Sequence, residues 1–126
     1  MRLGVLTIVA AGAGLAACDK QIDAPADTGV CWKMEQPANA PPKFNRLASG
    51  VPDLEHCAAQ LESTRVRMAS LGAVQNQVTG AYQGQFLFID RRGVFTAQSF
   101  NGYQYPFMVR TGDGRLAVPG AMPQSQ

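Results

Sequence analysis

The spacing of the apolar residues changes once along this chain, and that change most constrains the fold. Across residues 54–71, apolar side chains recur at three- and four-residue intervals, as on one face of an α-helix. Asp53 and Glu55 place acidic groups at the positive end of the helix dipole, and Gly72 is a natural stop. After Gly80 the sequence becomes rich in aromatic and β-branched residues. A helix followed by strands therefore indicates an α+β fold.

Turn sequences divide the second half of the chain into short segments. Asp90 to Gly93, Asn101-Gly102 and Thr111 to Gly114 all suit tight turns. We therefore expect strands over residues 30–34, 82–89, 94–98, 103–110 and 116–118. The predicted fold is one amphipathic helix packed on a small antiparallel β-meander of about three to four strands, with one disulfide.

The first eighteen residues have a separate character. Arg2 precedes an apolar run over residues 3–15, which as a helix would span roughly 20 Å, short of the ~30 Å hydrocarbon core of a bilayer. The run ends in Leu15-Ala16-Ala17-Cys18, which resembles the lipobox of bacterial lipoproteins. This resemblance implies cleavage before Cys18 and attachment of diacylglycerol and fatty acids such as palmitate to that residue. An ordinary secretory signal is the alternative.

The resemblance also implies an organisation and a location. It divides the chain into a signal peptide at 1–17, the lipidated Cys18 with a flexible tether at 18–28, a small α+β domain at 29–118 and a disordered tail at 119–126. The protein would be anchored in the cell envelope, facing the periplasm. Asp19 is similar to the signal that retains enteric lipoproteins at the inner membrane. The lipid bilayer is thus the first expected partner.

Two cysteines remain once Cys18 is assigned to the lipid. Cys31 and Cys57 suit a disulfide in an oxidising compartment. Such a bridge would tie the first strand to the start of the helix and stabilise the fold by about 3.5 kcal/mol. The alternative is a pair of buried free thiols.

The arrangement of the His, Cys and carboxylate residues argues against an enzyme. The only His, His56, stands beside Cys57, and adjacent helical residues point about 100° apart, which prevents easy activation of the thiol. The spacing of His and Cys matches no zinc site, and the carboxylates occupy turns or different helix faces. A net charge of +2 excludes a strongly electrostatic nucleic-acid binder. We expect no catalytic residue, metal or cofactor.

Arginines and aromatic residues are the remaining candidates for contact surfaces. Arg91, Arg92, Arg110 and Arg115 would form either a basic patch or ordinary solvated charge. The strand over 82–89 is apolar on both faces, and one helix covers only one of them. Trp32, Tyr103 and Tyr105 are therefore the candidate surface for a protein partner, unless these aromatic residues complete the core.

Two functions follow from these observations. The first is a lipid-anchored accessory or interaction module for a membrane or cell-wall complex. The second is a periplasmic module that binds a small ligand or acts as an inhibitor, with a pocket formed by the sheet.

Overall fold

The computed structural model describes residue 4 and residues 21–72 and 77–119 of the chain. The expected signal peptide, apart from Gly4, and Cys18 lie outside the described residues, as do residues 120–126 of the expected tail. The elements in chain order are β1 (Cys31–Glu35), β2 (Lys43–Ala48), α1 (Leu54–Ser70), β3 (Val78–Tyr82), β4 (Gln85–Asp90), β5 (Gly93–Ala97), β6 (Tyr105–Arg110) and β7 (Leu116–Ala117).

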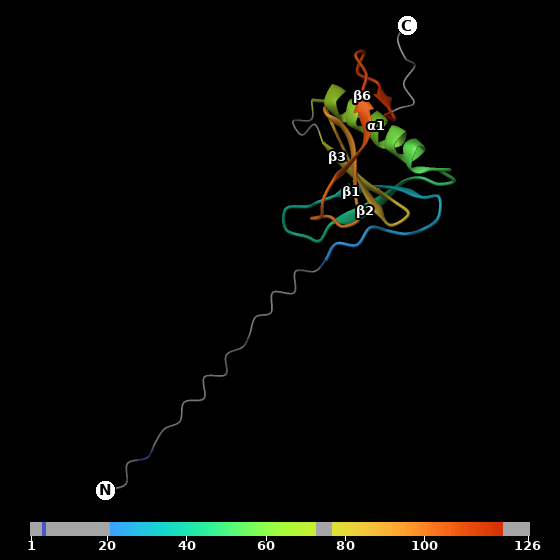
Figure 1. Cartoon of the computed structure of the whole chain (residues 1–126). Coiled ribbons are helices and arrows are strands. Elements are labelled where there is room, and N and C mark those ends of the chain that lie inside the picture. Colours follow the sequence, from blue (N-terminus) through green and yellow to red (C-terminus); the bar gives the residue numbers. More distant parts are fainter. Residues whose placement is uncertain (1–3, 5–20, 73–76, 120–126) are drawn as a thin grey trace.

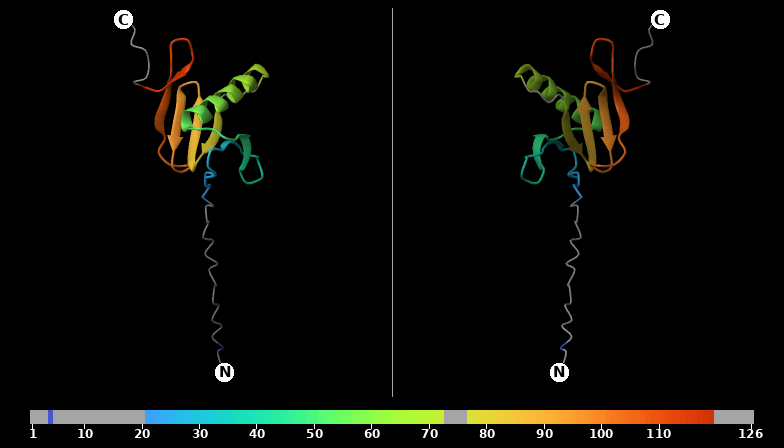
Figure 2. Two further views of the ribbon diagram at one scale, coloured as in Figure 1. Left: turned by 90° about the vertical axis from the view of Figure 1, so that its right-hand side faces the viewer. Right: turned by 90° about the vertical axis from the view of Figure 1, so that its left-hand side faces the viewer.

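The strands form one antiparallel sheet in the order β2-β1-β3-β4-β5-β6-β7. The chain leaves the β1–β2 hairpin through α1 and returns in β3, which pairs with the other edge of β1. The helix lies diagonally across one face of the sheet, here called the helix face (Figure 1, Figure 2). The opposite face is called the far face.

The helix and antiparallel sheet are confirmed, but the expected strand count was too small: the sheet has seven strands. The expected strand over 82–89 is interrupted by a turn at Gln83 and Gly84, both with positive φ. The small residues of β3 gave no strand signal. Edge strand β2 follows a Pro-rich segment, and half of its side chains are exposed and polar, so it lacked the regular apolar alternation by which strands are recognised.

The helix begins and ends close to where the sequence predicts. The Asp53 carboxylate accepts a hydrogen bond of 2.8 Å from the backbone N–H of His56, which caps the first turn. The apolar stripe faces the sheet, where Leu61 is fully buried with Leu87, Ile89 and other residues of β3 to β6. This packing forms the larger of the two clusters of buried apolar residues in the described part of the domain.

A second cluster occupies the far face of the sheet, and its centre is aromatic. Phe86 and Phe88 of β4 are buried there, with ring centroids 6.4 Å apart. They are joined by Met34 and Ala97, with Ile22, Ala24, Phe44, Phe95 and Phe100 packed against them; we call this set the aromatic cluster. Both faces of β4 are therefore buried. For this strand, the alternative stated above applies: its aromatic residues complete the core.

The segment before β1 lies against the domain over most of its described length. Ile22 and Ala24 pack on the aromatic cluster, and the Pro25 carbonyl accepts a 2.9 Å hydrogen bond from Gly84 N–H. The Gly29 N–H donates to the Gln83 side chain at 2.9 Å. Within the segment expected as a flexible tether over 18–28, Ile22, Ala24 and Pro25 therefore contact the folded domain.

The expected disulfide is confirmed. Cys31 at the start of β1 is bonded to Cys57 in the first turns of α1, with their Cα atoms 5.3 Å apart. Both cysteines are fully buried on the helix face. The bridge fixes the helix N-terminus over the β1–β3 part of the sheet.

Candidate functional site

Two tyrosines are the most exposed aromatic side chains in the described part of the chain. Tyr103 is 72% exposed and Tyr105 56% exposed, and their rings meet edge to face with centroids 4.6 Å apart. Tyr103 belongs to the loop over residues 98–104, and Tyr105 opens β6. We call these two residues the tyrosine pair. Its rings are available for contact with another surface.

The strand register determines the face on which the pair lies. Tyr105 is opposite Thr96, which in turn is opposite the buried helix-face residue Leu87. Because residues opposite each other point to the same side of a sheet, Tyr105 lies on the helix face. The helix packs on β1 to β4 and leaves this end of β6 uncovered.

Trp32, the third residue of the expected contact surface, lies elsewhere. It is opposite Ala81, which is opposite Phe86 of the aromatic cluster, so Trp32 is on the far face. Four inter-strand steps, about 19 Å, separate β1 from β6. Trp32 and the tyrosine pair therefore do not form one continuous surface.

The surroundings of Trp32 differ from those of the tyrosines. Its side chain is partly buried, and the guanidinium of Arg46 on neighbouring β2 lies 5.6 Å from the ring centroid. The indole Nε1 is buried and has no hydrogen-bond partner among the described residues. The Arg46 side chain, which is itself exposed, therefore lies over the indole ring.

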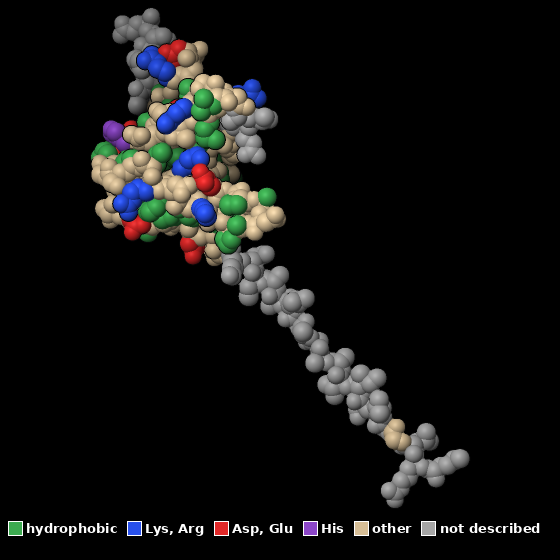
Figure 3. All heavy atoms as spheres, turned by 180° about the vertical axis from the view of Figure 1, so that it is seen from behind, with side chains coloured by type: hydrophobic (Ala, Val, Ile, Leu, Met, Phe, Trp, Pro, Cys, Tyr) green, Lys and Arg blue, Asp and Glu red, His purple; other side chains and the backbone are tan. Residues whose placement is uncertain are grey.

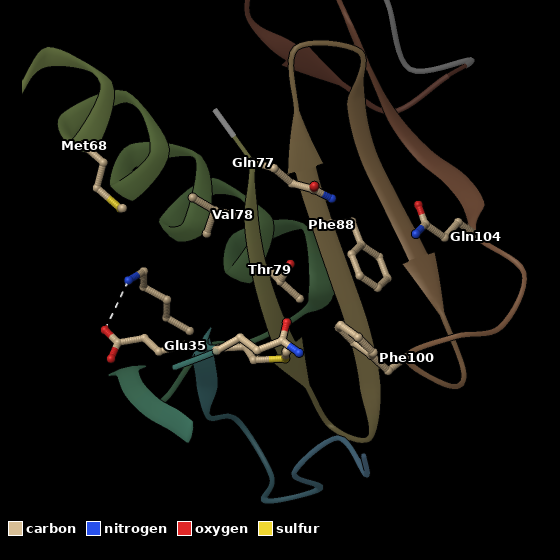
Figure 4. Close-up of a pocket in the computed structure, with 11 residues that line it drawn as sticks. Glu35, Met68, Gln77, Val78, Thr79, Phe88, Phe100 and Gln104 are labelled. Carbon is tan, nitrogen blue, oxygen red and sulfur yellow. Dashed lines mark hydrogen bonds and ion pairs between the residues drawn. The ribbon is translucent and has the colours of Figure 1, made fainter. Parts of the chain in front are cut away.

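A groove of about 810 Å³ is a feature that sequence reasoning missed. It runs from the end of α1 past the ends of β1 and β3 to the 98–104 loop (Figure 4). Met34, Phe88 and Phe100 contribute apolar surface, whereas Gln77, Thr79 and Gln104 contribute amide and hydroxyl groups. Lys33 and Glu35, paired at 3.4 Å, also line the groove. Five separate segments supply these residues, so no local motif could have indicated the groove.

The arginines of the possible basic patch are largely engaged with acids. Arg92 pairs with Asp90 at 2.8 Å and Arg115 with Asp113 at 2.7 Å. Arg110 donates to the Glu62 carboxylate on α1 at 3.0 Å and to the Asp90 carbonyl at 2.7 Å. On the face shown in Figure 3, Lys and Arg side chains are scattered with acidic ones between them. The arrangement favours ordinary paired surface charge.

Glu62 is the centre of a partly buried ion network. Its carboxylate accepts hydrogen bonds from Arg65, one turn along the helix, and from Arg110 of β6. Burial raises the pKa of Glu62, but the hydrogen bonds and charges of the two arginines outweigh it and lower the pKa to about 2. Arg65, which interrupts the apolar stripe of the helix, therefore has a structural role.

His56 and Cys57 are also accounted for locally. His56 is exposed, with Nδ1 2.6 Å from the Asp53 carboxylate, and Cys57 is bonded to Cys31. The backbone hydrogen bond from His56 is the main cause that lowers the pKa of Asp53. Within residues 21–72 and 77–119, no three His, Cys, Asp or Glu side chains gather as a metal site.

The described residues include no helix that is long and apolar enough to cross a membrane. Comparisons with protein-family models, with curated proteins and with solved structures found no match.

Proposed function

We propose that this protein is a lipid-anchored component of the bacterial envelope that acts as an accessory or interaction module for a membrane or cell-wall complex. The observation that carries the proposal is the sequence Leu15-Ala16-Ala17-Cys18 after a short apolar run. The Cys31–Cys57 disulfide supports it, because such bonds persist in oxidising compartments such as the periplasm. Asp19 favours the inner membrane.

The proposal explains how a small domain would act without catalysis. Acylation of Cys18 with two or more chains gives stable membrane attachment. A domain held at the bilayer meets membrane-bound partners at a raised local concentration, so weak contacts become effective. The tyrosine pair and the Trp32–Arg46 region are the two candidate contact regions, one on each face of the sheet.

Partner capture from native membranes tests this function. The acylated protein is isolated from gently solubilised membranes, and stoichiometric companions are identified by mass spectrometry. Replacing Tyr103 and Tyr105 with Ala, and separately Arg46 with Ala, identifies the region that holds the companion, while Arg91→Ala is the exposed control. A companion captured equally well by Cys18→Ser protein, or no companion at all, would count against an anchored interaction module.

The groove favours a second candidate, a ligand-binding module. Its volume of about 810 Å³ lies within the range of small-molecule sites, and it combines apolar floor residues with amide groups. A peptide or glycan with one apolar face would fit this chemistry. Binding of wall fragments or short peptides, weakened by Thr79→Val and Gln104→Leu but unaffected by Arg91→Ala, would support this function over the first.

A further inference from the structure

The chain between the proposed anchor and the folded domain is very short. Ile22 is already packed on the aromatic cluster, so only Asp19, Lys20 and Gln21 separate it from Cys18. Even fully extended, this connection spans roughly 14 Å. If Cys18 is acylated, as the proposed function requires, the surface around Ile22 must lie beside the headgroups of the bilayer.

The structure shows which surface that is. Ile22 and Ala24 pack on the same cluster as Phe100, and the Pro25 carbonyl is bonded to Gly84 N–H. The turn at Gln83-Gly84 and the 98–104 loop therefore surround the point where the chain enters the domain (Figure 1, Figure 2). The tyrosine pair is at this end of the sheet.

The two sheet connections at this end, the β3–β4 turn and the 98–104 loop, are uncharged, whereas the turns at the opposite end are not. No Asp, Glu, Lys, Arg or His occurs in the β3–β4 turn or between Gly93 and Val109. The opposite turns carry Asp90, Arg91 and Arg92, and residues 110–115 add three further charges. Charged groups are costly to bring toward hydrocarbon, while tyrosine suits the interface because its ring is apolar and its hydroxyl can stay hydrated.

We infer that the tyrosine pair, with the 98–104 loop, inserts into the headgroup region of the bilayer to which Cys18 is anchored. The acyl chains and the two phenolic rings would then fix the orientation of the domain, and the charged β4–β5 turn faces away from the membrane. Because the entering segment contains the exposed acids Asp23 and Asp27, attraction to anionic lipid is not the cause. The contact depends on the interfacial preference of the rings.

Tryptophan fluorescence in vesicles tests this orientation. Full-length acylated protein carrying Tyr103→Trp is placed in phosphatidylethanolamine–phosphatidylglycerol vesicles whose acyl chains are partly brominated, since bromine quenches nearby indole. Trp32→Phe removes the native signal, and a parallel set keeps Trp32 and subtracts its emission. Arg91→Trp, at the charged β4–β5 turn, is the matched control.

We expect the quenched fraction for Tyr103→Trp to exceed that for Arg91→Trp by at least about threefold, with a blue-shifted emission. Equal quenching at the two positions would overturn the inference. The mass of the same preparation is measured first, so absence of the acyl chains would refute the proposed function separately. Acylated protein that shows no quenching but loses a protein companion on Tyr103→Ala would assign the pair to that companion and overturn the bilayer contact.

Discussion

At the residue scale, Glu62 joins two distant parts of the chain. It is paired with Arg65 on its own helix and with Arg110 of β6, and the three side chains are 13–19% exposed. Because each charged side chain is largely removed from water, each is stabilised in the fold only while its oppositely charged partner is present. This network joins the helix to β6.

We predict that Glu62→Gln lowers the free energy of unfolding at neutral pH by about 1–3 kcal/mol, because two partly buried arginines lose their counter-charge. Urea unfolding measures the change. Glu55→Gln, an exposed acid in the first helical turn, is the control and should cost no more than about 0.5 kcal/mol.

Glu62 also makes the stability of the fold depend on pH. The pKa of Glu62 is about 2 in the folded protein and 4.5 ordinarily, so its stabilising effect is complete above pH 4.5 and lost as the pH falls toward 2. The wild type should therefore lose more stability across this window than Glu62→Gln. Parallel acid titrations of the two proteins would contradict the proposed role of this carboxylate.

The disulfide provides a second test at this scale. Reduction should destabilise the wild type by about 3.5 kcal/mol, because the bond closes a loop with a sequence separation of 26 residues. Thermal unfolding with and without reductant measures the loss. A variant with both cysteines replaced by Ala should be insensitive to reductant. Free thiols at Cys31 and Cys57 in the untreated wild type would refute the bond.

At the element scale, the close contact between α1 and β3 depends on Gly80. A Cβ at this position would lie 2.5 Å from a Leu61 methyl carbon and 2.5 Å from the Trp32 carbonyl oxygen. The helix can approach the sheet only because β3 has no side chain there. The same glycine weakened the strand signal in the sequence.

We predict that Gly80→Ala destabilises the fold by about 1–3 kcal/mol, since Leu61 and the β1 backbone must both move. Gly112→Ala is the matched control, because a Cβ there meets nothing within 4 Å. If the two variants melt at the same temperature, the helix does not pack on β3 as described.

This contact also explains how far the sequence could predict the fold. The helix and the disulfide were predictable because periodicity and cysteine number are local or countable signals. The strands β2 and β3 were not predictable. β2 is an edge strand with exposed polar side chains at half of its positions, and β3 contains small residues that give little strand signal. The groove and the separation of Trp32 from the tyrosine pair depend on sheet order, which no local pattern encodes.

At the scale of the whole molecule, the sheet has apolar residues on both faces and a different cover for each. The helix covers one face, and the segment around Ile22 and Ala24 with Phe100 covers the aromatic cluster on the other. The segment that leads to the proposed anchor therefore also packs on the core. In the proposed arrangement, anchor and domain act as one unit, with the β3–β4 turn and the 98–104 loop toward the bilayer.

We predict that Cys18→Ser transfers the protein from the membrane to the soluble fraction without altering its unfolding temperature, because Cys18 precedes the packed segment. Fractionation followed by immunoblotting measures the distribution. Persistence of the variant in the membrane after a salt wash would show that another feature holds the protein there.

The most direct test of the account is the intact mass of the protein isolated from bacterial membranes. We predict a chain that begins at Cys18 and carries a diacylglyceryl group with or without a further acyl chain. A chain that begins at any other residue, or one with an unmodified Cys18, would contradict it.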